Sequence, residues 1–263
     1  MAPGQAGATE DPTAEGRGSP QAAAGGRPAV LVTRPEPDAQ ATAALVRQRG
    51  FHPVVAPMLR ITPLPARLPP PGRVQAVLAG SLNAVRTLPE SLRGVPLLAV
   101  GDATAEEARR FGFREVRSAS GDAAALAALA AATLDPAGGP LLLPTRPGEG
   151  LRLAADVRAR GFRVIRRRTY DARAAGAMPA EAAAALRTGQ VVAALFFSAS
   201  AARVFAKVVR AEGLEAQLAG VEALAISAAA ASGLTGLAFR RIRFAARPDQ
   251  ESLLALLAAS CGT

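Results

Sequence analysis

Histidine, cysteine, tyrosine and tryptophan are almost missing from this chain of 263 residues. His52, Cys261 and Tyr170 are single occurrences, and there is no tryptophan. A lone cysteine excludes a disulfide framework within the chain. One histidine with one cysteine cannot form a zinc site of the usual kind. A Ser-His-Asp triad would depend on His52, which lies beside a proline in an apolar strand pattern.

Long apolar runs are missing as well. The longest stretch without charge, Ala223–Phe239, is shorter than the roughly 20 apolar residues of a membrane span and is rich in small residues. We therefore expect no membrane contact. Residues 1–27 consist mainly of Gly, Pro, Ala and Gln, which predicts a disordered tail. Its acidic residues and its lack of an apolar core speak against a targeting peptide, so we expect a cytoplasmic protein.

Lysine is the third scarcity. Lys207 stands alone, so the net charge of +10 comes almost entirely from arginine. The guanidinium fork matches carboxylates and phosphates, which predicts a substrate or partner rich in such groups. The same excess also fits a plain bias of composition toward Ala, Arg, Gly and Pro. Few aromatics are present to stack on bases, so we expect no nucleic-acid partner.

What the chain does contain is a regular alternation of short apolar runs and amphipathic segments. Strands are predicted at 29–33, 54–57, 74–79, 96–100, 114–116, 140–144, 191–197, 222–226 and 241–245. Helices are predicted at 38–49, 82–88, 103–111, 122–134, 149–160, 180–188, 199–210, 228–233 and 250–258. Such alternation indicates an α/β fold with parallel sheets flanked by helices. The number of strands fits two similar, flavodoxin-like sheets better than one.

Two segments of alternating polar and apolar residues, Leu59–Leu64 and Phe162–Tyr170, bracket the middle of the chain. If they pair, the middle is an inserted domain on a two-stranded β ladder, and the other domain is discontinuous. The predicted organisation is domain 1 at 28–58 and 173–260, the hinge at 59–67 and 163–172, and domain 2 at 68–162. Two domains on a hinge would face a cleft, which is a common place for a ligand.

An internal repeat supports two related halves. GSLNAVRTL from Gly80 resembles FSASAARVF from Phe197, and two further segment pairs follow in the same order. The two further pairs join Leu97–Ala108 to Ala223–Leu234, and Gly121–Ala131 to Pro248–Ala259. A gene duplication explains this better than chance in an alanine-rich chain.

Hydroxyl residues follow the predicted strands in both halves, where free N–H groups at a helix start attract anions. The candidates are Ser81 and Asn83 in one half and Ser198 and Ser200 in the other, with Thr104 and Ser227 at a second pair of turns. These residues follow the carboxyl ends of the predicted parallel strands, and ligands bind at that edge of such sheets. Plain helix capping explains the same residues equally well.

Four more residues qualify as candidates. Thr33 and Arg34 form a strand-end turn that faces the expected cleft, and Arg146 follows another strand. Tyr170 lies on the expected hinge after Arg166–Arg168, whose charges would favour the phenolate and make the phenol a better proton donor. A solvated arginine and a packing tyrosine are the alternatives. No phosphate-binding loop or GxGxxG fingerprint occurs, so no nucleotide cofactor is expected.

In sequence order, VLVTRPEPDAQ from Val30, AGSLNAV from Ala79, VGDATAEEARRFGF from Val100, RRTYDA from Arg167, LFFSASA from Leu195 and AARPDQESLLALL from Ala245 resemble the uroporphyrinogen-III synthase family. The resemblance runs from about Ala29 to the end of the chain. It implies two α/β domains joined by a two-stranded ladder, one of them discontinuous, with no metal or organic cofactor.

The resemblance also implies an activity. The family closes the linear tetrapyrrole hydroxymethylbilane, which carries eight carboxylates, into uroporphyrinogen III with loss of water and inversion of ring D. By resemblance Tyr170 is the candidate proton donor, and Ser81, Thr104, Ser198 and Ser200 match cleft positions. We expect a monomer that makes at most transient contact with the preceding pathway enzyme.

Two departures from the family pattern are local. Ser227 is followed by Ala228–Ala230 where some members have Pro-Thr-Thr, and the strand before Ser81 ends in Ala-Gly-Ser rather than Phe-Thr-Ser. Each change removes a hydroxyl group from the expected cleft. A hinge-type binding or sensory protein without catalysis is the alternative function, since the same cleft would serve it without Tyr170.

Overall fold

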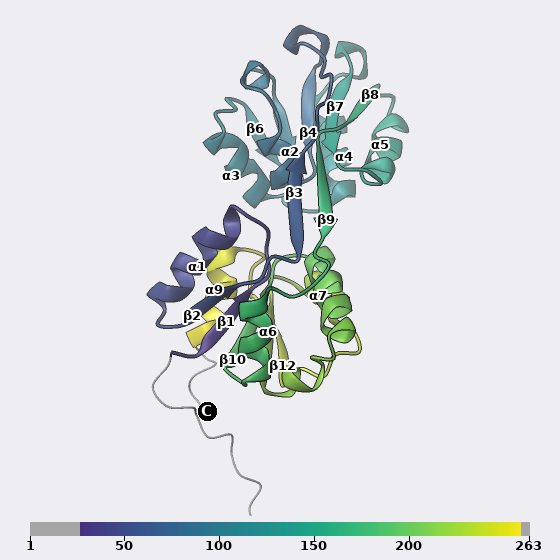
Figure 1. Ribbon diagram of the computed structural model, residues 1–263. Helices are drawn as coiled ribbons and strands as arrows, with labels where there is room; N and C mark the ends of the chain where they lie inside the picture. The colour runs from purple at the N-terminus through teal and green to yellow at the C-terminus, as the bar shows by residue number, and fades with distance from the viewer. Residues whose placement is uncertain (1–26, 259–263) are drawn as a thin grey trace, which may run out of the picture.

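Two lobes, one above the other, are joined by two neighbouring strands (Figure 1). The computed structural model describes residues 27–258. The predicted tail at residues 1–27 lies outside the described residues apart from Arg27. Within this described range no helix is long and apolar enough to cross a membrane.

The first lobe is built on five parallel strands in the order β12-β11-β10-β1-β2. The strands are β1 (Ala29–Val32), β2 (His52–Val55), β10 (Val191–Phe196), β11 (Glu222–Ala225) and β12 (Arg241–Phe244). One face is covered by α1 (Asp38–Gln48) and α9 (Gln250–Ala258), and the other by α6 (Ala180–Arg187), α7 (Ala199–Ala211), α8 (Ala228–Ala231) and the short turns η4 (Ala216–Gly220) and η5 (Ser232–Leu234). Val30 and Val32 pack toward α9, while Ala29 and Leu31 pack toward α7. Because both faces are buried, the strand is apolar throughout.

The second lobe repeats this plan in the order β6-β5-β4-β7-β8. The strands are β4 (Ala76–Ala79), β5 (Leu97–Ala99), β6 (Val116–Ser118), β7 (Leu141–Thr145) and β8 (Val164–Arg168). Helices α2 (Leu82–Arg86) and α3 (Asp102–Arg110) cover one face, and α4 (Ala123–Thr133) and α5 (Leu151–Arg158) the other. The short turns are η1 (Pro71–Arg73), η2 (Glu90–Leu92) and η3 (Pro136–Gly138). Two parallel sheets flanked by helices are the predicted fold class.

The two sheets have the same strand order if the sequence of one lobe is circularly permuted. Strands β4, β5 and β6 correspond to β10, β11 and β12, while β7 and β8 correspond to β1 and β2. The permuted alignment reveals a repeat that the comparison of segments in sequence order missed. Thr33-Arg34-Pro35 follows β1, and Thr145-Arg146-Pro147 ends β7, each beside the place where the strand order reverses. Ligands of open α/β sheets bind at such points.

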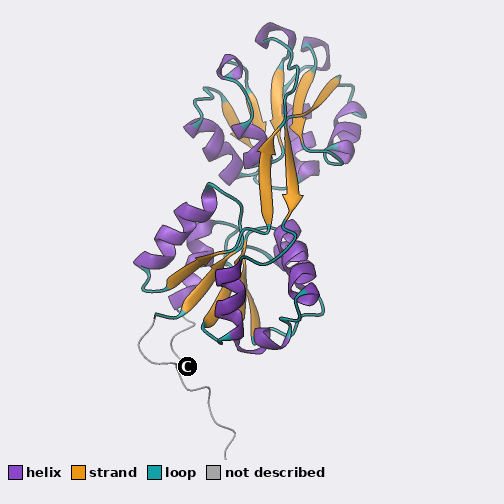
Figure 2. Cartoon of the chain, viewed as in Figure 1, coloured by secondary structure: helices purple, strands orange, loops and turns teal. Residues whose placement is uncertain are grey.

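The lobes are joined by an antiparallel ladder of β3 (Leu59–Pro63) and β9 (Tyr170–Ala174), the two long arrows between the lobes in Figure 2. The predicted two-stranded ladder is confirmed, with Leu59–Pro63 as one of its strands. The prediction of Phe162–Tyr170 as the other strand was wrong, because β8 pairs in parallel with β7 and β9 begins only at Tyr170. A half-buried edge strand and a half-exposed ladder strand have the same alternating pattern, so the sequence did not separate them.

Gly233 gives a test of the packing in the first lobe. A Cβ atom at this position of η5 would lie 2.6 Å from the Arg203 nitrogen and 2.7 Å from the Ala199 oxygen, both in the backbone of α7. We expect Gly233→Ala to lower the free energy of unfolding by about 1–3 kcal/mol, the cost of an overpacked contact. Urea denaturation measures this, with Gly176→Ala as the control because its Cβ would meet nothing within 4 Å. Equal stability of the two variants would contradict the close approach.

Candidate functional site

A cleft of about 260 Å³ lies between the lobes, at the carboxyl ends of strands from both sheets. It brings together eight of the ten predicted site residues. The first lobe contributes Arg34, Ser198 and Ser200, the second Ser81, Asn83, Thr104 and Arg146, and the ladder Tyr170. Thr33 and Ser227 do not line it. A second cavity adjoins this cleft, since Ser81, Glu149 and Tyr170 line both.

Three of the predicted serines are helix caps. Ser81 accepts a hydrogen bond from the Ala84 N–H at 3.1 Å, and Ser198 and Ser227 accept the equivalent bonds from Ala201 and Ala230 at 3.2 Å. Each hydroxyl still has its own hydrogen to donate. Capping and anion binding are therefore compatible at Ser198, which lines the cleft. Ser81 also lines the cleft but shares a hydrogen bond with Tyr170, and Ser227 caps α8 away from it.

The side chain of Thr33 lies in the core of the first lobe. It is fully buried, and its hydroxyl donates to the Leu195 carbonyl of β10 at 2.6 Å. The next residue, Arg34, turns its side chain into the cleft. Thr33 therefore fixes the strand end from which Arg34 projects.

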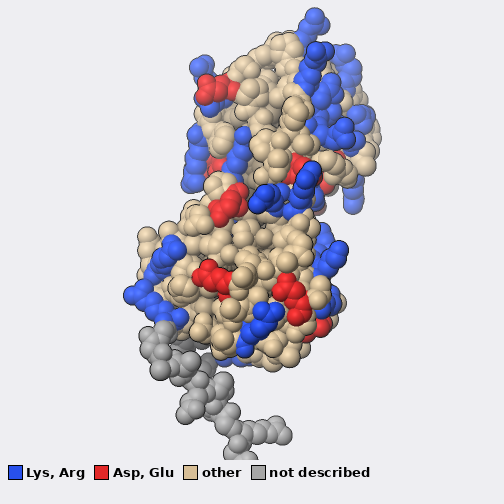
Figure 3. Space-filling view, in the orientation of Figure 1, with Lys and Arg blue, Asp and Glu red and all other residues tan. Residues whose placement is uncertain are grey.

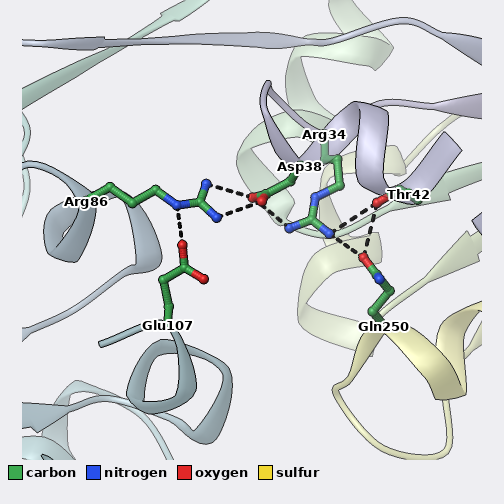
Figure 4. Close-up of polar contacts among 6 residues, drawn as sticks. All are labelled: Arg34, Asp38, Thr42, Arg86, Glu107 and Gln250. Carbon is green, nitrogen blue, oxygen red and sulfur yellow. Dashed lines mark hydrogen bonds and ion pairs between the residues drawn. The ribbon is translucent and has the colours of Figure 1, made fainter. Parts of the chain in front are cut away.

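Arg34 lies in the cleft with both terminal nitrogens already engaged. Nη1 donates to Gln250 at 2.6 Å and to Thr42 at 3.3 Å, and Nη2 donates to Asp38 at 2.9 Å (Figure 4). Its guanidinium also lies 4.3 Å from the centre of the Phe197 ring, a cation–π contact. Burial lowers the pKa of Arg34, although the charge of Asp38 opposes this. The guanidinium stays charged and rigidly held.

Arg146, the equivalent residue of the second lobe, is held more loosely. Its contact is an ion pair with Glu149, whose side chain is 47% exposed. This hydrogen bond raises the pKa of Arg146, with burial acting in the opposite direction. Both residues line the cleft. Because the pairing carboxylate faces solvent, a carboxylate of a ligand can replace it at Arg146 with little reorganisation.

Tyr170 begins β9 at the junction of the ladder and the second lobe. The side chain is 4% exposed, and its hydroxyl lies 2.9 Å from the Ser81 hydroxyl. Burial raises the pKa of Tyr170 above its ordinary value, and Glu149 adds to this, while the Ser81 hydrogen bond and the charge of Arg146 lower it. The expected lowering of this pKa by Arg166–Arg168 was wrong, because burial dominates and the cation that acts on the phenol is Arg146. The phenol is therefore neutral at physiological pH.

The excess of arginine is not concentrated in the cleft. Figure 3 shows basic side chains gathered on the side of the second lobe where β8 and α5 lie. In the cleft, Arg34 and Arg146 each have a carboxylate partner. Within residues 27–258 no group of three or more His, Cys, Asp and Glu side chains is placed to hold a metal ion. His52 is exposed and lies 3.7 Å from Glu181, away from the cleft.

Several cleft residues escaped the sequence analysis. Asp38 and Glu149 each follow one of the two Thr-Arg-Pro turns at a similar distance, and the Phe197 ring contacts the guanidinium of Arg34. The repeated turn followed by an acid was the available signal. In the first lobe the Thr-Arg-Pro turn precedes the other repeated segments, whereas in the second lobe it follows them. A comparison in sequence order therefore does not align the two turns.

Comparisons with known proteins agree on one family. The model of the family described as uroporphyrinogen-III synthase HemD matches residues 40–255. The crystal structure of the uroporphyrinogen-III synthetase from Helicobacter pylori has a TM-score of 0.60 and 18% identity over 89% of this chain and 99% of that chain. A mutant uroporphyrinogen III synthase from the extremely thermophilic bacterium Thermus thermophilus has a TM-score of 0.53 and 20% identity over 88% and 96%. No curated protein matches the chain in sequence.

The two structures share the fold, and the family model covers most of the chain. The chain belongs to the uroporphyrinogen-III synthase family.

Proposed function

We propose that this chain is a uroporphyrinogen-III synthase that converts hydroxymethylbilane into uroporphyrinogen III, a step of tetrapyrrole biosynthesis. The observation that carries the proposal is the placement of Tyr170. Its buried, neutral hydroxyl reaches a cleft whose walls are the strand ends of two sheets. The family match supports the same activity. The monomeric state, the cytoplasmic location and the domain boundaries predicted above belong to this proposal.

The cleft suits a flexible polycarboxylate. Arg146 offers a charged fork that exchanges Glu149 for a substrate carboxylate. Ser198, Ser200, Asn83 and Thr104 offer neutral donors from both lobes. Each neutral hydrogen bond contributes about 1 kcal/mol, whereas one to a charged group contributes about 1.5–3 kcal/mol. Binding is therefore spread over many contacts, with Arg146 the largest single one.

Tyr170 supplies the proton that the reaction needs. The Ser81 hydroxyl accepts from Ala84 and shares a hydrogen bond with the Tyr170 hydroxyl in which either oxygen can donate. When Ser81 donates, the phenolic hydrogen is free to face the substrate. It protonates the hydroxymethyl oxygen on ring A, and the C–O bond breaks with both electrons on oxygen. Water departs, and an azafulvene cation remains on ring A.

The cleft then determines which carbon attacks. Ring D adds to the cation through its substituted carbon and forms a spiro intermediate. The original bond between this carbon and the methylene bridge of ring C then breaks, which gives a second azafulvene, and the bridge bonds to the other α carbon of ring D, so that ring D is inverted. The proton that ring D loses on closure balances the one that Tyr170 donated. The pyrroles supply the electrons, so the protein contributes the proton and the proximity of the two ends.

The decisive assay supplies freshly made hydroxymethylbilane to the purified protein and separates the products after oxidation. Without an enzyme the bilane closes to the type I isomer, so we expect the type III isomer only with active protein. Tyr170→Phe should lower the rate of type III formation by about 10²–10⁴-fold, the usual contribution of a positioned acid, with an unchanged circular dichroism spectrum. An undiminished rate would remove the proton-donor role. Type I alone, with a ligand bound unchanged, would favour the binding-protein alternative.

The pKa of Tyr170 is measurable without interference, because the chain has one tyrosine and no tryptophan. Near-ultraviolet absorbance of the phenolate should rise with a midpoint above about 10, the ordinary value, and denatured protein should titrate at about 10. Because the folded-state pKa is raised, the neutral phenol stabilises the fold at lower pH and this contribution disappears as pH rises through that midpoint. A midpoint below that of the denatured chain would contradict the buried, neutral acid.

Arg146 tests the mode of substrate binding. Arg146→Gln removes the charged fork, so KM for hydroxymethylbilane should rise about 10-fold or more while kcat changes less, as expected for a binding interaction. Steady-state kinetics of type III formation measure both values. The control is Arg109→Gln, an exposed arginine paired with Glu106 within α3. A loss confined to kcat would contradict the carboxylate-binding role of Arg146.

A further inference from the structure

One network of charged side chains crosses from one lobe to the other. Arg86, the last residue of α2 in the second lobe, donates to both carboxylate oxygens of Asp38, the first residue of α1 in the first lobe, at 2.6 and 3.0 Å. Figure 4 shows Asp38 between the guanidinium groups of Arg86 and Arg34, and Glu107 below Arg86. Arg86 Nε donates to Glu107 at 2.5 Å.

The network is self-contained and largely shielded from water. The exposed fractions of the side chains are 15% for Arg34, 21% for Asp38, 18% for Arg86 and 11% for Glu107. Two positive and two negative groups balance. Bidentate pairs of this kind are specific in geometry, and removal of one partner leaves a shielded charge without compensation. The network therefore favours one relative placement of its members.

This network is also the direct polar link between the lobes. Within residues 27–258, the bonds between Arg86 and Asp38 are the only side-chain hydrogen bonds and ion pairs that join the first lobe to the second without passing through the ladder. The network also reaches the site. Asp38 lines the cleft, and the helix that ends at Arg86 begins after Ser81, the partner of Tyr170.

We propose that Arg86 and Asp38 are positioning residues that clamp the lobes and set the width of the cleft in front of Tyr170. The clamp keeps the carboxylate-binding groups of the two lobes at the separation that a folded bilane requires. It rests on the proposed function for its kinetic consequence but not for its structural one. If the clamp opens, the competent form is a smaller fraction of the molecules, and the apparent affinity for substrate falls by that fraction.

The groups that face Asp38 keep the clamp ionised. Burial acts to raise the pKa of Asp38, but the hydrogen bonds and charges of Arg86 and Arg34 outweigh it and leave the pKa below its ordinary value. Glu107 contacts Arg86 on the other side, and Thr42 and Gln250 hold Arg34. A lowered carboxylate pKa means that the clamp is complete at neutral pH and is lost only as pH falls through that value.

The test measures the distance between the lobes directly. Spin labels are attached at Ala44→Cys in α1 and Ala131→Cys in α4, both exposed positions, in the full chain with Cys261→Ser. Without substrate we expect a single narrow distance distribution that broadens in Arg86→Gln and in Asp38→Asn. The double variant should broaden it no further than either single one, because the two residues act through one bond. Arg86→Lys should restore part of the narrow distribution, since it keeps the charge without the fork.

Kinetics of type III formation give the second readout. Arg86→Gln should raise KM about 10-fold with kcat within about 2-fold, whereas Arg93→Gln, which breaks an exposed ion pair with Glu90 inside the second lobe, should change neither. A narrow distribution in both Arg86→Gln and Asp38→Asn, with lowered thermal stability alone, would overturn the clamp. If the wild-type chain forms no type III isomer, the proposed function fails, and the label distances still decide the clamp.

Discussion

The ends of parallel strands control the arrangement of this protein. In each lobe every strand of the sheet runs in the same direction, so the helix starts and strand-end turns of that lobe collect at one edge. A short ladder brings these two edges to a common cleft and carries Tyr170 at its junction with the second lobe. The polar groups that line the cleft are therefore brought together by the fold itself. They follow from the direction of the strands and from the register of β3 with β9.

Charge is used sparingly where the substrate is expected. The chain carries a net charge of +10, yet Arg34 and Arg146 in the cleft are each paired with a carboxylate of the protein. The arginines of the two equivalent Thr-Arg-Pro turns are therefore held in different ways. Arg34 is fixed by three partners and an aromatic ring and supports the lobe, whereas Arg146 has a solvent-facing partner that it can exchange.

Much of this could be predicted from the sequence, because local patterns carry it. Apolar runs of strand length followed by Ser81 or Ser198 located the sheets, the helix starts and most of the cleft. The remainder depends on contacts between distant residues. Gln250 meets Arg34 across 216 positions of the chain, and no local pattern indicates that the guanidinium is already occupied. The pKa of Tyr170 depends on burial, which the neighbouring arginines in sequence do not report.

We expect the strand edges of both lobes to hold one ligand at the same time. Amide chemical shifts followed during titration with uroporphyrinogen III, kept reduced, test this most directly. The backbone N–H groups at the start of α7 (Ser198–Ser200) and of α3 (Gly101–Thr104) should shift together with a single binding constant, because the two lobes line one cleft. Shifts confined to one lobe, or centred on the arginine-rich face of β8 and α5, would contradict the account.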